Sequence, residues 1–356
     1  MNKMKVAVFN DVKSLEIEEA YLPKVTASTI LIKVEACAVC TWEQRVYTGV
    51  KEVSFPFIGG HEIAGEIVAL GSEVNSLIWK VGAKVVYGTN LACGDCYQCK
   101  SGDEQNCYNF DHSKQLPGLP YPGMGGFSEY ILVEPRHLFP YWHVTPQEAA
   151  LAEPLSCVIH SSETAGIAYG DTVVVIGCGI MGLLHIQLAV KSGALVIASD
   201  PQPERLVKAQ ALGAQHTINP LVENLEIAVQ ELTRNIGAQI VFDTTPIAEI
   251  VSQSLDLLAN NGKLVLYSSF YPDSPVAFSP DTLHKTATQI QGTANSNSRD
   301  FMRSAKMISE GIIDMKPLIS AVYGFEDIKA GLESAIQGDK YRVVIDYQKK
   351  EGDVSC

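Results

Sequence analysis

Residues 172–182 read T-V-V-V-I-G-C-G-I-M-G, an apolar β-branched run followed by glycines in G-x-G-x-x-G spacing. Gly177 permits a tight turn out of the strand, Gly179 lets a pyrophosphate approach the backbone, and Gly182 lets the next helix pack against the strand. The free N–H groups at the start of that helix then face the phosphates. The alternative is a glycine-rich turn without a ligand. The predicted cofactor-binding residues here are Gly177, Gly179, Ile180, Met181 and Gly182.

The chain that follows alternates between strand and helix patterns. Such a βαβ series predicts a Rossmann-type, doubly wound parallel sheet with helices on both faces. The expected strands are Thr172–Ile176, Ala194–Ser199, Ile240–Phe242 and Lys263–Tyr267, and the expected helices include Ile180–Lys191 and Pro203–Leu212.

Asp200 closes the second of these strands, at about the 20-residue distance from the glycines that the fingerprint requires. A carboxylate at this position accepts hydrogen bonds from the adenosine ribose and repels a 2′-phosphate, so it favours NAD over NADP. The alternative is a helix N-cap before Pro201. Arg205 lies one helical turn further on, where it either covers the adenine or is an ordinary surface arginine.

The first part of the chain has a different character. Its β-rich runs, at Thr29–Glu35, Ile63–Leu70 and Lys84–Tyr87, alternate with glycine and proline turns, which predicts a compact all-β unit. The segment from Phe325 to Tyr347 reads as a short helix and the strand Arg342–Tyr347, which is expected to rejoin the first unit. A length of 356 residues fits about two domains.

Four cysteines lie close together in C-x2-C-x2-C-x7-C spacing. Four thiolates close a tetrahedron around one Zn²⁺ and leave no position for a substrate, so the site would be structural. Two disulfides or an iron–sulfur cluster are the alternatives. The predicted ligands, in a lobe at about residues 90–110, are Cys93, Cys96, Cys99 and Cys107.

Composition excludes several classes of partner. The formal net charge of −13 disfavours nucleic acid and anionic membranes. No run approaches the ~18 apolar residues of a membrane span, and the N-terminal Met1–Lys5 segment lacks an apolar signal run. Nine cysteines without a signal peptide indicate a reducing compartment, and the cytoplasm is expected.

Cys40, His61, Glu62 and Glu153 form a third group of candidate functional residues. One thiolate, one imidazole and one or two carboxylates leave a position open on zinc for water or an alcohol. These residues are far apart in sequence, however, and a lone cysteine or histidine more often belongs to a core.

Taken together, these motifs resemble the zinc-dependent medium-chain alcohol dehydrogenases, in particular the sorbitol and threonine dehydrogenase branch. The resemblance covers nearly the whole chain. It rests on the four-cysteine lobe, the dinucleotide fingerprint, G-H-E-x-x-G at 60–65, G-G-F-S-E-Y at 125–130 and E-P-L-S at 153–156.

The resemblance implies roles for individual residues. Cys40 and His61 match ligands of a catalytic zinc, and Glu153 matches the third protein ligand. Glu62 matches a neighbouring carboxylate that either binds the metal or exchanges with water. Arg342 resembles an arginine that contacts the cofactor pyrophosphate. Two zinc ions per chain and NAD are therefore expected.

The resemblance also implies the domain organisation. It predicts a GroES-like catalytic domain at 1–154, a Rossmann NAD-binding domain at 155–292 and a return to the catalytic domain at 293–356. The site would lie in the cleft between the two domains. Dimers and tetramers both occur among similar proteins, so a homo-oligomer is expected.

One departure concerns proton transfer. The family places Ser or Thr two residues after the ligand cysteine and often His five after it, but here Trp42 and Arg45 occupy those positions. Thr41 offers a hydroxyl one place early, and on an extended segment it would face away from Trp42. A water or Glu62 is the other candidate acceptor. Arg45 is either a surface residue or, if it lies in the pocket, a contact for a carboxylate or phosphate.

The expected activity is hydride transfer between a secondary alcohol and NAD, assisted by zinc. A small polyol, sugar or amino-alcohol is the expected substrate. The alternatives are a zinc-independent quinone or enoyl reductase and a non-catalytic dinucleotide-binding protein. Candidate pocket walls are Trp42, Tyr47, Phe110 and Tyr271.

Overall fold

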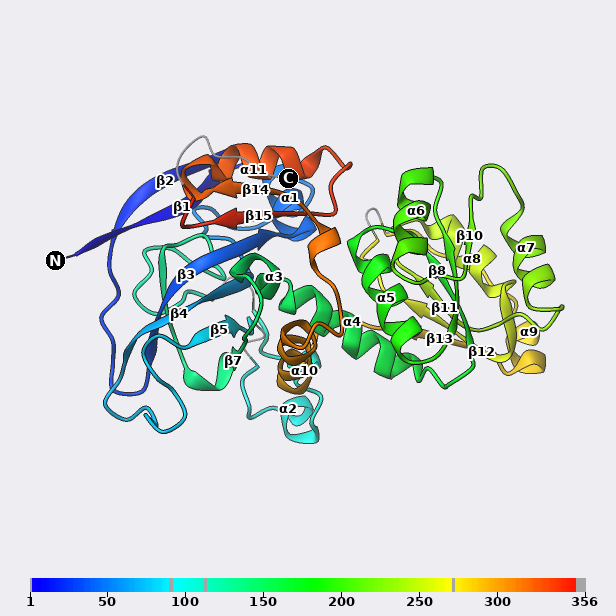
Figure 1. Cartoon of the computed structure of the whole chain (residues 1–356), viewed down its shortest axis with the longest axis horizontal. Coiled ribbons are helices and arrows are strands. Elements are labelled where there is room, and N and C mark those ends of the chain that lie inside the picture. Colours follow the sequence, from blue (N-terminus) through cyan, green and yellow to red (C-terminus); the bar gives the residue numbers. More distant parts are fainter. Residues whose placement is uncertain (1, 90–91, 112–113, 271–272, 350–356) are drawn as a thin grey trace. The chain divides into compact units, whose positions relative to one another are not determined.

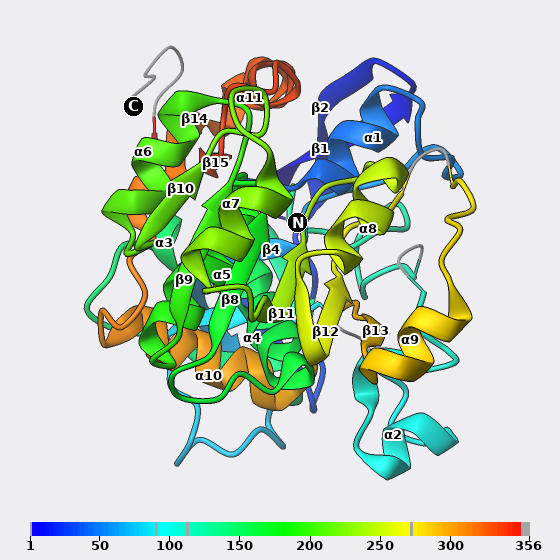
Figure 2. The ribbon, with the colours of Figure 1, turned by 90° about the vertical axis from the view of Figure 1, so that its right-hand side faces the viewer.

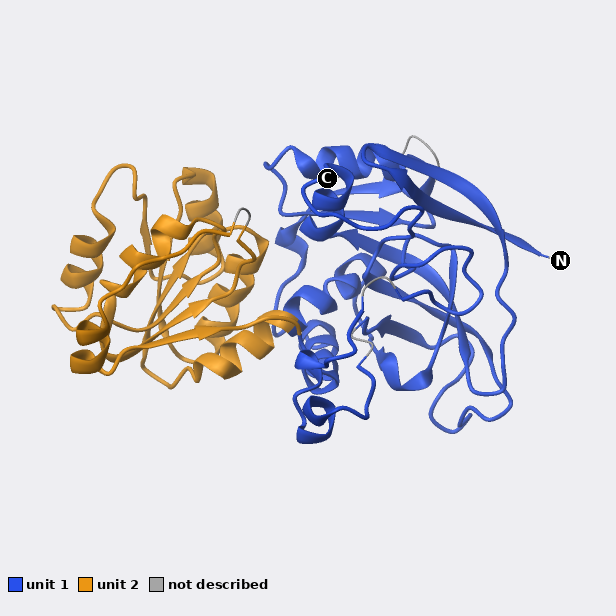
Figure 3. Ribbon diagram, turned by 180° about the vertical axis from the view of Figure 1, so that it is seen from behind, with its two compact units in different colours: residues 1–156, 296–356 blue, residues 157–295 orange. Residues whose placement is uncertain are grey.

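The structure is a computed structural model that describes residues 2–89, 92–111, 114–270 and 273–349 (Figure 1). Tyr271 lies outside these residues. The chain divides into two compact units, shown in Figure 3: unit 1 comprises Met1–Ser156 and Ser296–Cys356, and unit 2 comprises Cys157–Asn295. Among the described residues, no helix combines the length and apolar character needed to cross a bilayer.

Unit 1 is built on a β-sheet with the strand order β14-β15-β3-β4-β5-β7, with β6 also paired to β3. The strands β1 and β2 form a separate antiparallel ribbon. The strands are β1 Lys3–Asp11, β2 Ser14–Tyr21, β3 Ile30–Val39, β4 Glu62–Leu70, β5 Lys84–Tyr87, β6 Tyr130–Val133, β7 Leu138–Pro140, β14 Ile319–Gly324 and β15 Arg342–Asp346. The helices are α1 Thr41–Tyr47, α2 Tyr97–Ser101, α3 Pro146–Ala150, α10 Ser298–Ser309 and α11 Ile328–Ile336. The helix α4, Ala152–Ala165, begins in unit 1 and continues into unit 2.

The core of unit 1 joins the sheet to the ribbon. Phe9 on β1 is fully buried and packs against Phe57 and Phe127, with ring centroids 6.2 Å apart in each case. Backbone hydrogen bonds between Phe9 and Phe57 fix the segment that leads into β4. The ribbon therefore holds the segment that ends at His61.

Unit 2 is a parallel six-stranded sheet with the order β10-β9-β8-β11-β12-β13, side by side in Figure 2. This order is that of a Rossmann domain, which confirms the predicted fold class. The strands are β8 Thr172–Ile176, β9 Leu195–Ser199, β10 His216–Ile218, β11 Ala238–Asp243, β12 Leu258–Leu266 and β13 Gln289–Gly292. The helices are α5 Ile180–Lys191, α6 Pro203–Ala211, α7 Leu225–Leu232, α8 Ala248–Leu255 and α9 Pro280–Thr286.

Helices cover both faces of the unit 2 sheet, as side-chain alternation along β11 shows. Val241 packs in a cluster with Val229 of α7 and Val251 of α8. The next residue, Phe242, points to the opposite face and contacts His185 of α5 at 4.4 Å between ring centroids. Successive strand residues face opposite sides, so this sheet buries both of its faces.

His185 is a fully buried polar residue in this core. Its Nδ1 lies 2.8 Å from the carbonyl oxygen of Met181, and its Nε2 lies 3.0 Å from Ser161 Oγ. The neutral ring satisfies both contacts if Nδ1 donates and Nε2 accepts. Burial lowers the pKa of His185 to about 4.

We expect His185 to make the protein less stable in acid. Below pH 6.5 the unfolded chain binds a proton that the folded chain binds only near its lowered pKa of about 4. The contribution of His185 to the free energy of unfolding is therefore at its full value above pH 6.5, and it falls by roughly 3 kcal/mol as the pH drops toward 4. Urea unfolding followed between pH 4 and 7 should show this slope weakened in His185→Gln and kept in the exposed control His216→Gln. Equal slopes in all three proteins would contradict it.

Candidate functional site

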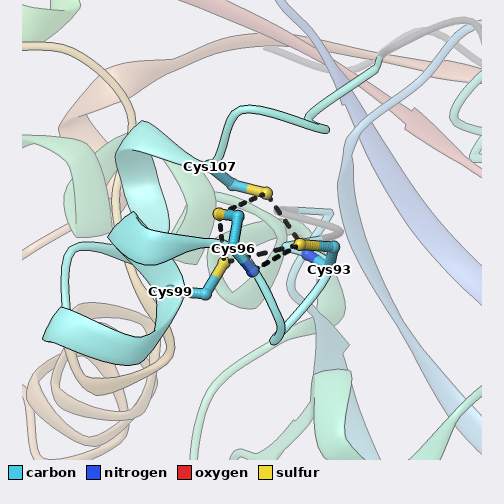
Figure 4. Close-up of side chains that lie close together, drawn as sticks. All are labelled: Cys93, Cys96, Cys99 and Cys107. Atoms are coloured by element: carbon cyan, nitrogen blue, oxygen red, sulfur yellow. Dashed lines mark hydrogen bonds between the residues drawn. The ribbon is translucent and has the colours of Figure 1, made fainter.

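The four cysteines of the 90–110 lobe lie together around one point (Figure 4). The sulfur of Cys96 lies 3.5 Å from that of Cys99 and 3.9 Å from that of Cys107, and Cys93 and Cys99 are 4.0 Å apart. Four sulfurs about 2.3 Å from a tetrahedral Zn²⁺ would be about 3.8 Å from one another. A disulfide needs about 2.05 Å, and an iron–sulfur cluster needs room for several atoms. The geometry therefore fits a single zinc ion.

Hydrogen bonds to sulfur prepare this lobe for a cation. The side-chain amide of Asn109 donates to Cys93 Sγ at 3.3 Å, and the backbone N–H groups of Asp95 and Cys96 donate to it at 3.4 Å. These donors stabilise the thiolate and lower the pKa of Cys93 to about 6. Thiolate is the form that binds metal.

A second cluster forms where β3 and β4 pair. The register places Ala38 opposite Glu62, so Cys40, just beyond the end of β3, lies beside His61, just before β4. The ligand atoms of Cys40, His61 and Glu62 all lie within 4.8 Å of one another. His61 and Glu62 are buried, and Cys40 is half-buried. A thiolate, an imidazole and a carboxylate at this spacing suit a catalytic zinc.

Glu43 orients the imidazole of this cluster. It is fully buried on α1, one helical turn after Cys40, and its Oε1 lies 2.7 Å from His61 Nδ1 and accepts the Gly60 N–H at 3.0 Å. With Nδ1 donating to the carboxylate, Nε2 is left to bind a metal. Burial disfavours the charged ring, but Glu43 and Cys40 outweigh it and raise the pKa of His61 well above its usual value. The same anions favour a metal cation there.

Glu43 was not singled out in the sequence. Its signal was the spacing C-x2-E at the start of a helix, which places a carboxylate beside a ligand cysteine. Such an outer carboxylate fixes the tautomer and orientation of a ligand histidine.

We expect Glu43→Gln to weaken zinc binding at this cluster by about 10- to 100-fold, because the amide orients the ring less well and carries no charge. Competition with a chelator, followed by metal analysis, measures the affinity. The exposed neighbour Glu52 provides the control Glu52→Gln. Unchanged affinity in Glu43→Gln would show that the tautomer of His61 is fixed in another way.

The carboxylate of Glu62 is buried, and one of its oxygens is available to bind a metal. Its Oε1 lies 2.8 Å from Arg342 Nη2, while its Oε2 accepts no hydrogen bond from the described residues. Burial raises the pKa of Glu62 to about 7, with Arg342 opposing the rise and Glu153 adding to it. A buried oxygen without a donor is costly, and a metal would satisfy it.

Arg342 and Glu153 lie near the cluster of Cys40, His61 and Glu62 but are not members of it. Arg342 is buried, and besides Glu62 it donates from Nη1 to the Val39 carbonyl at 3.3 Å. Its contact with the cofactor pyrophosphate stays a prediction. Glu153 is half-buried in the first turn of α4 and lies outside the group whose ligand atoms are within 4.8 Å. Its charge nevertheless acts on both Glu62 and Arg342.

The segment after Cys40 is the helix α1, and the expectation of an extended segment was wrong. Successive residues of a helix are about 100° apart around its axis, so the side chains of Thr41 and Trp42 diverge by about 100° instead of 180°. Thr41 is exposed. The Trp42 ring lies edge-on to His61 at 6.3 Å between centroids and packs against Phe57 at 5.4 Å.

The other proposed pocket residues are placed as follows. Arg45 and Phe110 are half-buried. Tyr47 lies in the core of unit 1, and its hydroxyl donates to Glu333 Oε1 at 2.7 Å. Nothing in these contacts assigns the three residues to a pocket.

The glycine loop after β8 has the geometry of a dinucleotide cradle. Gly177 has φ +89°, and a side chain at Gly182 would place its Cβ 1.8 Å from the Gly177 carbonyl oxygen. A Cβ at Gly179 would meet nothing within 4 Å, so the space at the start of α5 is open. Ile180 and Met181 form the first turn of that helix.

We expect two alanine substitutions to separate folding from cofactor binding. Gly182→Ala should lower stability by about 1–3 kcal/mol or more, because its Cβ overlaps the backbone. Gly179→Ala should lower the unfolding temperature much less, since only the preference of an N-cap for glycine over alanine is lost. It should weaken NAD binding, because its Cβ occupies the open cradle. Thermal unfolding and NADH fluorescence titration measure these effects. Gly292→Ala is the control, since its Cβ also meets nothing within 4 Å. A Gly179→Ala protein that binds NADH normally would contradict the cradle.

Asp200 is buried at the end of β9 and supports this loop. Its Oδ2 accepts the Cys178 N–H and its Oδ1 accepts the Gln202 N–H, each at 2.8 Å. The N-cap of α6 is Gln202 rather than Asp200. Arg205 Nη1 lies 4.0 Å from Asp200 Oδ2. The ribose contact of Asp200 and the adenine contact of Arg205 stay predictions.

Two protein families match this chain. The alcohol dehydrogenase GroES-like domain matches residues 26–143, and the zinc-binding dehydrogenase family matches residues 181–310. The first match contains both predicted zinc clusters apart from Glu153.

Individual proteins are similar over nearly the whole chain. An erythritol/L-threitol dehydrogenase from Mycolicibacterium smegmatis is 31% identical and covers 94% of this chain and 95% of its own. A sorbitol dehydrogenase from Bacillus subtilis is 29% identical, with 94% of each chain covered. The crystal structure of a zinc-binding dehydrogenase from Sinorhizobium meliloti bound to NADP is 26% identical, has a TM-score of 0.87, and covers 97% of this chain and all of its own.

These matches confirm the resemblance that the motifs indicated, and they agree with the fold and with the two clusters. The chain belongs to the zinc-dependent alcohol dehydrogenases of the medium-chain dehydrogenase/reductase family.

Proposed function

We propose that this protein oxidises a secondary alcohol of the polyol, sugar or amino-alcohol type, with NAD as the hydride acceptor. The observation that carries the proposal is the cluster of Cys40, His61 and Glu62, whose ligand atoms lie within 4.8 Å of one another. Glu153 is proposed to complete the ligand set. The proposed arrangement has units 1 and 2 as the catalytic and cofactor domains.

Cys40, His61 and Glu62 would hold a zinc ion, which would supply Lewis acidity toward the hydroxyl of the substrate. The chain's own residues prepare the cluster. Glu43 holds His61 with Nε2 directed at the metal position, and Arg342 compensates the buried charge of Glu62. Trp42 packs against His61 and limits access of water from that side.

Proton release needs a route that differs from that of most relatives, because Trp42 occupies the position of their hydroxyl. Thr41 is exposed at the first position of α1. We propose that it passes the proton to solvent, with a water or Glu62 as the alternative acceptor.

NAD is proposed over NADP because the carboxylate of Asp200 is fixed by two backbone N–H groups beside the glycine loop. A fixed negative charge repels a 2′-phosphate. The relative from Sinorhizobium meliloti was crystallised with NADP, so the ratio of kcat/KM for the two cofactors is the necessary measurement. A homo-oligomer, dimer or tetramer, and a cytoplasmic location are also proposed.

The deciding experiment is zinc per chain on purified protein, paired with NADH formation across polyols, amino-alcohols and sugar acids. Two zinc ions with NAD-dependent turnover would support the proposal. One zinc ion without turnover would favour the quinone or enoyl reductase alternative, in which the cluster binds no metal.

A further inference from the structure

The clearest unexplained cation near the catalytic cluster is Lys51. Its ammonium lies 5.8 Å from the centroid of the Trp42 ring, and its backbone N–H donates to the Arg45 carbonyl at 3.0 Å. The hydrogen bond ties the loop that carries Lys51 to α1. Trp42 in turn lies edge-on to His61. The indole ring therefore has both the lysine and the His61 imidazole as neighbours.

Lys51 has no carboxylate within ion-pair distance among the residues that the structure describes. It is half-buried. By contrast Lys84, on β5, makes ion pairs with Glu35 and Glu66 at 2.6 and 2.8 Å. An aromatic face attracts an ammonium but takes none of its hydrogen bonds, so Lys51 keeps its donors for another partner.

The position of this lysine suits one end of a substrate. The Lys51 ammonium and the His61 ring lie 5.8 and 6.3 Å from the centre of the Trp42 ring, so the ammonium is within about 12 Å of the imidazole. In a chain of net charge −13, an anion would be repelled by the overall field and would need a local cation to bind.

We propose that Lys51, seated on Trp42, is a specificity-determining residue that binds a carboxylate or phosphate on the substrate, at the end away from the reacting alcohol. This inference rests on the proposed function. It narrows the substrate class to acidic or phosphorylated polyols, because an anion adds the attraction of opposite charges to the hydrogen bonds that a neutral polyol would also accept from the ammonium.

The test compares matched substrates in the zinc-loaded, full-length enzyme: a pentitol with its monophosphate, and erythritol with erythronate. Lys51→Met should raise KM for the acidic member of each pair by about 10- to 100-fold and leave kcat and the neutral member nearly unchanged. Lys51→Arg should retain most of the affinity. Lys24→Met, at an exposed lysine, is the control. The two pairs distinguish phosphate from carboxylate.

A binding measurement tests the same inference without turnover. Trp42 becomes the only tryptophan in the Trp79→Phe/Trp142→Phe background. Titration of inorganic phosphate and of malonate should change its fluorescence saturably, less so at high ionic strength, and not at all after Lys51→Met. This readout stays informative if no alcohol is oxidised, so it separates failure of this inference from failure of the proposed function.

The inference is overturned by any of three results. In the first, the wild-type enzyme prefers the neutral substrates. In the second, Lys51→Met protein with normal zinc content shows the same loss of activity toward both members of a pair. In the third, the fluorescence response to anions persists after Lys51→Met. The second result would assign Lys51 to packing against Trp42 alone.

Discussion

His61→Asn should remove one zinc ion per chain and lower kcat/KM for alcohol oxidation by at least about 10³-fold. The Lewis acidity of a bound metal contributes several kcal/mol to catalysis, and about 1.4 kcal/mol corresponds to a factor of ten in rate. The asparagine amide is a poor zinc ligand, and the substitution also leaves Glu43 without its charge partner at 2.7 Å. Metal analysis and steady-state kinetics on the same preparation measure both effects.

The matched control for this prediction is His216→Asn, at an exposed histidine of unit 2. It should keep both zinc ions and full activity. The unfolding temperature of His61→Asn needs to be recorded as well, because loss of folding would lower activity for a different reason. A folded His61→Asn protein that retains two zinc ions would show that the cluster around Cys40 does not hold the catalytic metal.

Cys96→Ser should remove the other zinc ion and unfold the lobe around it. The helix α2 has five residues and buries none of them, so it cannot be stable by itself. Structural zinc in small motifs contributes about 10–16 kcal/mol of apparent binding energy, which is folding energy. We expect one zinc ion fewer per chain, an unfolding temperature lower by about 10 °C, and new protease cleavage in the lobe.

Cys157→Ser is the control for the lobe, because Cys157 lies in α4 and outside both clusters. Its zinc content and protease pattern should match those of the unsubstituted protein. If Cys96→Ser kept two zinc ions and resisted protease, the four sulfurs would not be the ligands of a structural metal.

The sequence predicted regular elements well where local signals were strong. The bounds of β8 and α5 match the expected ranges, because the glycines between them end the strand and start the helix. The strand β12 was expected at Lys263 but begins at Leu258. Its pairing with β11 is irregular there, and Asn261 has φ +62°. The N-N-G run indicates a turn, yet Leu258 before it and Lys263 after it both pair with β11, so the run is an irregularity within one strand.

The candidate site was harder to predict because its contacts join distant residues. The predicted ligands Cys40, His61 and Glu62 were assigned through the family resemblance, because residues so far apart in sequence do not define a site by their spacing. The pairing of Arg342 with Glu62 depends on β15 lying beside β3, although β15 comes from the far end of the chain. The helical state of Thr41–Tyr47 was missed, since the run is short and carries no strong capping signal: Cys40 is its N-cap and makes no side-chain cap hydrogen bond.

The strand order of unit 1 also has a consequence for synthesis on the ribosome. β3 takes β15 as its neighbour, and β15 links it to β14, so an interior part of this sheet comes from residues 342–346. All of unit 2 is translated before this strand, and its sheet uses only its own strands. When unit 2 has been synthesised, every strand of its sheet is present, but β3 still lacks β15 and so has an open edge. A nascent chain paused before residue 342 would expose this edge of β3. We expect a chaperone to bind the nascent chain at that edge.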